Sequence, residues 1–256
     1  MSYTKSEIDL IIVDSINLLY YQYKKLLLAS INANAADRQK YETELIKSVG
    51  EGVYNKVKAL FADEKYREEV LADLKRRGIE CVTFVSADYP EQLKHVDCPP
   101  IVLYLRGRRE LLSTRMFAVV GSRRTPANIA EETKRLCAEL SKFVTIVTGV
   151  ADGGDSAAIT GALTTGNVIC VLPGGHDANC CNNVNLYKRV EREGLALTEF
   201  TPTVPVQRFT FRMRNRIIAG LAEGLLVVSA GEKSGTSSTV EFATAYNKDV
   251  FAFPYS

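Results

Sequence analysis

The chain has no tryptophan, only two histidines and no excess of either charge, since 32 Lys and Arg residues stand against 30 Asp and Glu residues for a formal net charge of +2. A protein that coats DNA indiscriminately would be more one-sidedly basic. No apolar run approaches the ~18 residues of a membrane span, and no basic leader precedes a small-residue cleavage site. These absences disfavour a membrane protein and a secreted protein, so we expect a cytoplasmic location without membrane contact.

Cysteine is present, but without the spacing of a metal site or a disulfide framework. The six cysteines stand at positions 81, 98, 137, 170, 180 and 181, with no repeated CxxC pair. This scatter is typical of reduced, structural thiols. His176 and Asp177 are near Cys180 and Cys181 in the sequence, but adjacent cysteines are awkward ligands for one ion. We therefore expect no metal ion and no other cofactor.

The pattern of apolar residues divides the chain into three parts. Residues 1–79 carry apolar residues at helical spacing, for example in the amphipathic run 18–26, and predict a small helical domain. Residues 80–110 contain two short strand-like runs and are expected to link the helical domain to the rest and pack on its core. The remainder, residues 111–256, has a different texture.

That third part repeats a short apolar run, a glycine or small polar turn, and a helical pattern. The runs are residues 117–120, 144–148, 168–172, 195–200, 225–230 and 250–253. Repetition of this kind predicts an α/β fold, namely a doubly wound, Rossmann-like, mostly parallel sheet with helices on both faces. Because the runs are apolar almost throughout, we expect these strands to be buried on both sides.

The turns that follow the strands are the candidate ligand sites, because ligands of doubly wound sheets bind at the carboxyl ends of the strands. Glycines there let an anion approach the backbone, while hydroxyls and cationic side chains supply further contacts. The candidates in these turns are Gly121, Ser122, Arg123, Arg124, Gly174, Gly175, Lys233, Ser234, Gly235 and Thr236.

Two further turns are predicted to be structural. Asp152 and Asp155 in the turn after residue 148 would repel phosphate, and Asp155 is expected to cap the following helix. Thr125 is expected to cap another helix whose first residue is Pro126. His176 is interpreted as a polar turn residue, because no nucleophile with a base partner accompanies it.

An interleaved Phe/Arg strip spans residues 208–216, and no Asp or Glu occurs between Glu199 and Glu223. Guanidinium groups match phosphate oxygens, and a phenylalanine ring offers a face on which any base can stack. The strip therefore predicts a path for a nucleic-acid strand of any sequence, whereas the alternative is a solvated loop with core phenylalanines. The residues expected to line this path are Phe211, Arg212, Arg214, Asn215 and Arg216.

An ordered set of motifs over roughly residues 80–254 resembles the DNA-processing protein A (DprA/Smf) family. The motifs are Tyr89-Pro90, Pro99-Pro100, Val120-Gly121-Ser122-Arg123, Leu172-Pro173-Gly174-Gly175, Arg214-Asn215-Arg216-Ile217-Ile218-Ala219-Gly220-Leu221, Ser234-Gly235-Thr236 and Val250-Phe251-Ala252-Phe253-Pro254. The resemblance implies a homodimer with a Rossmann-like core that binds single-stranded DNA without sequence preference, protects it during natural transformation and loads the RecA recombinase. Because the sequence shows no plausible catalytic constellation, we expect no enzymatic activity.

Residue by residue, the resemblance implies that Gly121, Ser122 and Arg123 contact a DNA phosphate. Gly174, Gly175 and residues 234–236 would assist them, and Phe211 with residues 214–216 would line the strand path. The chain departs from the family pattern at several positions, which are Ile159 in place of histidine, residues 179–181 in place of Tyr-Pro, Arg212 in place of proline and Ser229 in place of glutamate. It also ends directly after the motif at residues 250–254, so a divergent or shortened member is expected.

A second hypothesis is a nucleotide-hydrolysing enzyme. Gly235 and Thr236, with Glu241 on the following helix, are similar to the GGxGTxxE element of the cytokinin-activating phosphoribohydrolases. The double glycine of that element is absent before Gly235. A third possibility is a domain that binds a nucleotide without turnover.

Overall fold

The computed structural model describes residues 3–16, 43, 46–47, 50–231 and 235–254. The chain divides into two compact units, of which the first is Met1–Ala87 with Cys98–Val102 and the second is Asp88–Asp97 with Leu103–Ser256. The division of the chain into parts 1–79, 80–110 and 111–256 stays a prediction.

The described part of the first unit is mainly helical. Its elements are α1 (Lys5–Ser15), α4 (Glu51–Ala62), α5 (Glu64–Arg76) and the strand β1 (Glu80–Thr83). α1 begins with a capping box, in which the Thr4 side chain accepts from the Glu7 amide and the Glu7 carboxylate accepts from the Thr4 amide. The predicted amphipathic run 18–26 lies outside the described residues.

The second unit alternates strands and helices. Its elements are α6 (Glu91–Lys94), β2 (Val102–Gly107), a 3-10 helix (Arg109–Ser113), β3 (Met116–Gly121), α7 (Ala127–Leu140), β4 (Thr145–Thr148), α8 (Gly154–Ala162), β5 (Val168–Val171), α9 (Val184–Glu193), β6 (Leu195–Thr198), α10 (Arg208–Leu221), β7 (Gly224–Ser229), α11 (Thr236–Ala245) and β8 (Asp249–Ala252). Each apolar run predicted from the sequence is a strand, β3 to β8 in order.

These strands form one sheet in the order β2-β6-β5-β4-β3-β7-β8. Neighbours from β6 to β8 pair in parallel, and only β2 runs antiparallel, against β6. From β3 the chain proceeds through β4 and β5 to β6 on one side, then crosses to β7 and β8 on the other. The order therefore reverses between β3 and β7, which is the topological switch point of a doubly wound sheet.

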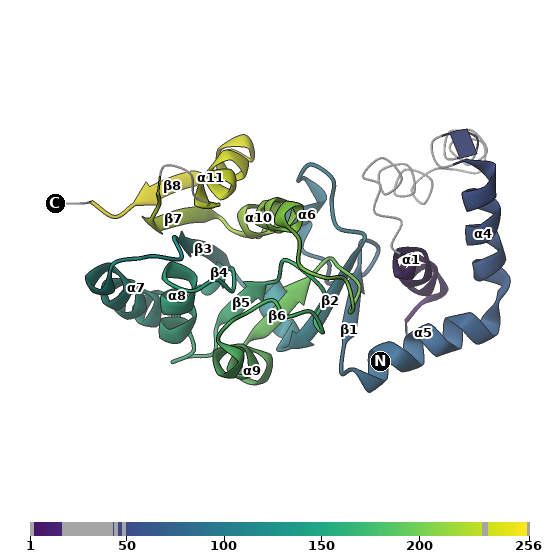
Figure 1. Cartoon of the computed structure of the whole chain (residues 1–256), viewed down its shortest axis with the longest axis horizontal. Coiled ribbons are helices and arrows are strands. Elements are labelled where there is room, and N and C mark those ends of the chain that lie inside the picture. The colour runs from purple at the N-terminus through teal and green to yellow at the C-terminus, as the bar shows by residue number, and fades with distance from the viewer. Residues whose placement is uncertain (1–2, 17–42, 44–45, 48–49, 232–234, 255–256) are drawn as a thin grey trace. The chain divides into compact units, whose positions relative to one another are not determined.

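Helices cover both faces of this sheet, which confirms the predicted fold class. α7, α8 and α9 pack on one face, and α10 and α11 pack on the other (Figure 1). β4, β5, β6 and β7 are buried along their whole length, as expected for strands between two helical layers.

Three local predictions are wrong. β8 is exposed at all four positions, because it is an edge strand with β7 on one side only. Pro126 occupies the N-cap position of α7, while the Thr125 hydroxyl donates to the Ser122 carbonyl instead of capping. Gly153 is the N-cap of α8, and Asp155 lies within the first turn. No described helix is both long and apolar enough to cross a membrane.

Candidate nucleic-acid interface

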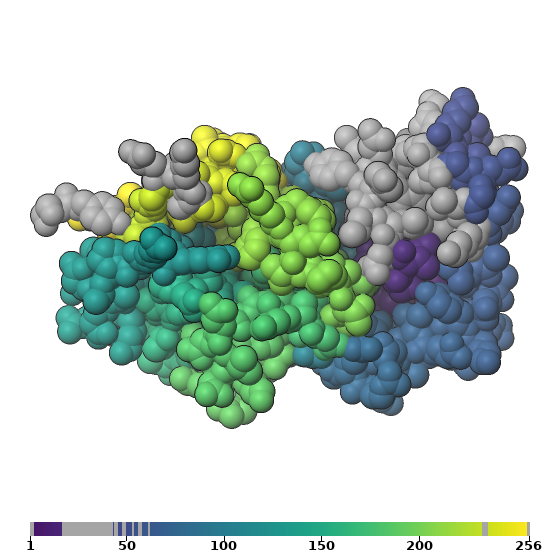
Figure 2. Space-filling view, in the orientation of Figure 1, coloured from purple at the N-terminus to yellow at the C-terminus, as the bar shows by residue number. Residues whose placement is uncertain are grey.

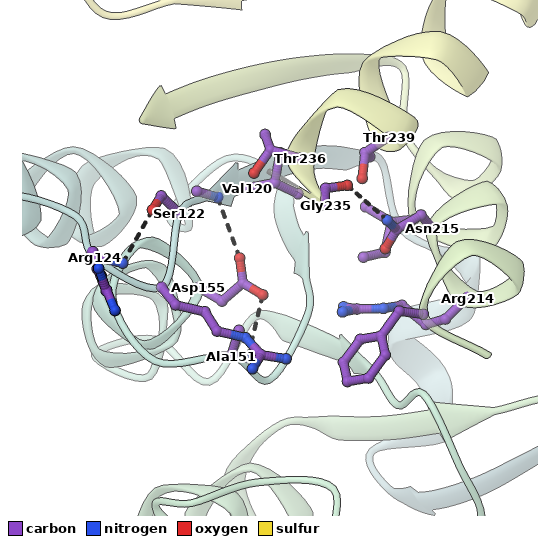
Figure 3. A pocket seen from close by; sticks show the side chains of 14 residues that line it. Val120, Ser122, Arg124, Ala151, Asp155, Arg214, Asn215, Gly235, Thr236 and Thr239 are labelled. Atoms are coloured by element: carbon purple, nitrogen blue, oxygen red, sulfur yellow. Dashed lines mark hydrogen bonds between the residues drawn. The ribbon is translucent and has the colours of Figure 1, made fainter. Parts of the chain in front are cut away.

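A pocket of about 380 Å³ lies at the carboxyl end of the sheet, at the switch point between β3 and β7. The turn after β3 and the starts of α8 and α11 form its walls together with one face of α10 (Figure 3). Of the predicted site residues, it gathers Gly121, Ser122, Arg123, Arg124, Phe211, Arg214, Asn215, Gly235 and Thr236. Segments far apart in the sequence thus meet where the fold class places a ligand.

The turn after β3 is held by a close approach of two backbones. A Cβ atom on Gly121 would lie 2.8 Å from the Cα of Gly154, and one on Gly154 would lie 2.6 Å from the Cα of Gly121. The strand register of β3 against β7 shifts at Gly121. Glycine is therefore required at both positions to bring the start of α8 against the end of β3.

Hydrogen bonds then fix the polar residues of this turn. The Ser122 amide donates to the carbonyl and hydroxyl of Ser229 at 2.9 and 3.0 Å. The Ser122 hydroxyl accepts from the Arg124 amide at 3.0 Å. The side chain of Arg123 remains exposed beside the pocket. The turn is thus held by several hydrogen bonds, and Arg123 lines the pocket beside it.

Asp155 is a buried carboxylate in the pocket wall. Its oxygens accept from the amides of Gly121 and Ala151, each at 3.3 Å, and so join the turns that follow β3 and β4. Burial raises the pKa of Asp155, while the nearby charge of Arg214 acts in the opposite direction. The sequence pattern predicts only a capping role for Asp155, because no sequence signal links it to an arginine almost 60 residues later.

Arg214 brings a cation into the interior beside the pocket. Its side chain points toward Asp155 (Figure 3), and the residue is only 5% exposed. Burial lowers the pKa of Arg214, and the charge of Asp155 partly counteracts this. One guanidinium nitrogen donates to the Val171 carbonyl at 3.4 Å, whereas Nε has no hydrogen-bond partner among the described residues. Arg214 is therefore a buried cation with one nitrogen that no described residue uses.

Phe211 lies close to both arginines of the site. The guanidinium carbon of Arg123 is 5.3 Å from the centroid of the Phe211 ring, and that of Arg214 is 6.0 Å away. Both distances are within the range of cation–π attraction. The ring is half-buried and lines the pocket.

Asn215 holds the start of α11 at the pocket. Its amide nitrogen donates to the Gly235 carbonyl at 3.1 Å and to the Ser238 hydroxyl at 2.8 Å. α11 begins at Thr236 without a side-chain cap and without an acid in its first turn. Such a helix start favours an anion, because its first amides have no partner within the helix. Lys233 and Ser234 lie outside the described residues.

Gly174 and Gly175 are not brought to this pocket. The Gly175 amide donates to the Val204 carbonyl at 2.9 Å, and a Cβ atom there would collide with the carbonyls of Thr201 and Pro202. These glycines therefore permit another loop of the same chain to pack against them. Their predicted ligand contact has no geometric support here.

The adjoining His176 is also part of this packing. Its ring nitrogens lie 3.0 Å from the Tyr187 hydroxyl and 3.0 Å from the Tyr104 carbonyl oxygen. Burial lowers the pKa of His176 to about 4. Among the described residues no group of three or more His, Cys, Asp or Glu side chains is placed to hold a metal ion.

Two other predicted arginines of α10 also point elsewhere. Arg212 is exposed, and its guanidinium donates to Glu241 at 3.0 Å and lies 5.3 Å from the Phe242 ring centroid. Arg216 is buried and donates to Glu199 at 2.5 Å. Glu241, the carboxylate of the hydrolase alternative, thus bonds to Arg212 at the surface and does not line the pocket.

Comparison with known proteins identifies the family. The model of the family described as DNA recombination-mediator protein A matches residues 80–256. The chain is 35% identical over 191 residues to the DNA processing protein DprA of Bacillus subtilis, which covers 73% of this chain and 64% of that protein. It is 36% identical over 170 residues to its Streptococcus pneumoniae counterpart, covering 66% and 60%. The chain thus spans less than two thirds of these relatives.

Solved structures agree with this result. The crystal structure of DNA processing protein A from Streptococcus pneumoniae superposes with a TM-score of 0.74 at 29% identity, covering 100% of this chain and 88% of that one. The structure of DNA processing protein A from Helicobacter pylori, which describes its single-stranded DNA binding mode, superposes with a TM-score of 0.61 at 28% identity, covering 70% and 81%. The chain belongs to the DNA recombination-mediator protein A family, also called DprA or Smf.

Proposed function

We propose that this chain binds single-stranded DNA without sequence preference, through phosphate contacts in the pocket between β3 and β7. The observation that carries the proposal is the convergence of Arg123 and Arg214 on a pocket that also contains the uncapped start of α11. Cations and helix amides are the groups that proteins use to bind phosphate oxygens.

The kinds of group in the pocket support binding that is independent of sequence. Its two arginines and the helix start suit phosphate, and its one partly covered ring can contact any base. The relation to the Helicobacter pylori protein, whose structure concerns single-stranded DNA binding, supports the choice of a single strand.

The test is a fluorescence-anisotropy titration of labelled oligo-dT and of a duplex at several salt concentrations. We expect tighter binding to oligo-dT, with an affinity that falls as salt rises. Arg123→Ala and Arg214→Ala should each weaken binding about tenfold and lower the salt slope by about 1. Arg135→Ala, which removes an exposed arginine of α7, is the matched control. Equal or absent binding of both DNA forms would contradict the proposal.

The wider role is part of the same proposal. A protein of this family that holds single-stranded DNA would protect the strand in transformation and present it to RecA, and we propose that it works as a homodimer. Light scattering of the purified chain measures the oligomeric state. Pull-down of purified RecA, with and without oligo-dT, tests the partnership, and a negative result in both conditions would exclude direct loading by this chain.

We also propose that the chain is not a hydrolase. The pocket wall contains the buried Asp155, whose oxygens already accept two backbone amides, and Glu241 lies outside the pocket. Incubation with nucleoside monophosphates should release no free base. Release that depends on Asp155 would establish the alternative activity.

A further inference from the structure

The two phenylalanines at the start of α10 have different surroundings. Phe211 is half-buried in the pocket, with the guanidinium carbons of Arg123 and Arg214 at 5.3 and 6.0 Å from its centroid. Phe209 is 51% exposed, and within the described part of the chain its ring contacts neither a guanidinium group nor another ring. The sequence alone treats the two rings as equivalent members of one strip.

The surroundings of Phe211 make it a support for cations. A base that stacked on the ring would compete with the guanidinium of Arg123, which stands over it. The charge of Arg123 also lowers the pKa of Arg214, so the two cations repel each other at this site. The attraction of both to one ring offsets part of this repulsion. Phe211 thus contacts both of the cations that line the pocket.

The surroundings of Phe209 fit a base. Residues two apart on a helix point roughly 200° apart, so Phe209 lies off the pocket face of α10. Arg208 beside it is exposed, and the first turn of α10 has no acid, so the helix start is electropositive. The segment that includes this turn lies at the surface, coloured yellow-green in Figure 2. An exposed ring beside a cation at such a helix end is a stacking platform for a single strand.

We infer that the two rings have different tasks: Phe211 positions the guanidinium groups for phosphate, and Phe209 stacks on a base of the strand that leaves the pocket. The inference rests on the proposed binding of single-stranded DNA. It assigns a DNA contact to a residue outside the motif that carries the family resemblance. It also predicts that base stacking and phosphate capture can be removed separately.

The experiment compares oligo-dT with an abasic oligonucleotide of equal length and the same phosphate count, titrated at several salt concentrations. Phe209→Ala should weaken binding of oligo-dT about tenfold, leave the abasic strand unaffected and leave the salt slope unchanged. Phe211→Ala should weaken binding of both strands by the same factor and lower the salt slope. Phe143→Ala removes another exposed ring, between α7 and β4, and should change nothing.

The outcomes distinguish a failure of this inference from a failure of the proposed binding of single-stranded DNA. If the unmodified chain binds neither strand, the proposed function fails and the inference with it. If it binds oligo-dT but Phe209→Ala weakens both strands equally or neither, or if Phe211→Ala affects oligo-dT alone, the inference is wrong and the proposed function stands. Unchanged melting temperatures of Phe209→Ala and Phe211→Ala exclude unfolding as the cause. If either is destabilised, Phe209→Leu and Phe211→Leu keep an apolar side chain without the ring and replace the alanine variants in the same titrations.

Discussion

Both sides of the sheet's carboxyl end combine paired glycines, an arginine from α10 and a buried carboxylate. On the β3–β7 side, Arg214 and Asp155 border a pocket, and the glycine pair brings α8 against the end of β3. On the β5–β6 side, Arg216 bonds to Glu199 in the interior, and Gly174 and Gly175 are covered by the chain itself. The same residue types therefore build a binding site in one place and a packed polar core in the other.

The two sides differ in the hydrogen-bond partners of their arginines, Arg214 and Arg216. Arg216 forms an ion pair with Glu199 at 2.5 Å, whereas in the described part of the chain the oxygens of Asp155 accept backbone amides and Arg214 donates to the Val171 carbonyl. A cation whose partner is already engaged is available to an external anion. A cation in a close buried pair is not, because separating the pair would leave two uncompensated charges.

The largest effect expected from this comparison is on stability. Arg216→Met should lower the free energy of unfolding by about 3–5 kcal/mol, because it leaves the carboxylate of Glu199 buried without its arginine. Urea denaturation measures the loss. Arg214→Met should cost less, because burial already raises the pKa of Asp155 and this carboxyl can take up a proton.

A double variant and the relative losses of the two single variants test this comparison. The double variant Arg216→Met/Glu199→Met should recover most of the loss, since it removes both buried charges. A double variant as unstable as the single one would show that the ion pair is not the cause. Equal losses for Arg214→Met and Arg216→Met would remove the proposed distinction between the two sides.

The second prediction concerns the stability of the β5–β6 side at acidic pH. Burial lowers the pKa of His176 from 6.5 to about 4, with Arg106 and Asp177 as its nearby charged groups. A depressed pKa stabilises the fold above pH 6.5, and this contribution is lost as the pH falls toward 4. The shift corresponds to about 3 kcal/mol at most. His176→Gln should lack this part of the pH dependence in urea denaturation, and parallel pH profiles for both proteins would contradict the burial argument.

Much of this architecture could be predicted from the sequence, because it follows from local patterns. The apolar runs predicted the strands, and the rule that ligands bind at the carboxyl ends of parallel strands made the turns at residues 121–124 and 235–236 candidates, which the structure brings to one pocket. The exposure of β8 could not be read from its apolar sequence, because it depends on the strand's place at the sheet edge.

The division of the arginines and glycines could not be predicted, because it depends on distant partners. No sequence pattern near Arg216 predicts its contact with Glu199, and none near Asp155 predicts the proximity of Arg214. Likewise, a Gly-Gly pair indicates only that something approaches the backbone closely. At Gly175 the approaching group is the carbonyl of a loop of the same chain, not a ligand.

The smallest expected effect concerns the start of α11 on the β3–β7 side. Asn215→Ala removes two hydrogen bonds to the residues that begin α11, which should cost about 1 kcal/mol of stability. Because these bonds hold the helix start at the pocket, the affinity for oligo-dT should fall by a comparable free energy, about fivefold. The salt slope should stay unchanged, since no cation is lost.

Asn185→Ala, which removes an exposed asparagine of α9, is the control for this measurement. If Asn215→Ala lowers stability but leaves DNA affinity intact, the start of α11 is not a phosphate contact, and Arg123 and Arg214 alone carry the binding. If Asn215→Ala lowers affinity as expected, DNA binding on the β3–β7 side depends on the uncapped start of α11. The geometry of helix starts, more than the presence of arginine, would then distinguish a binding site from a polar core.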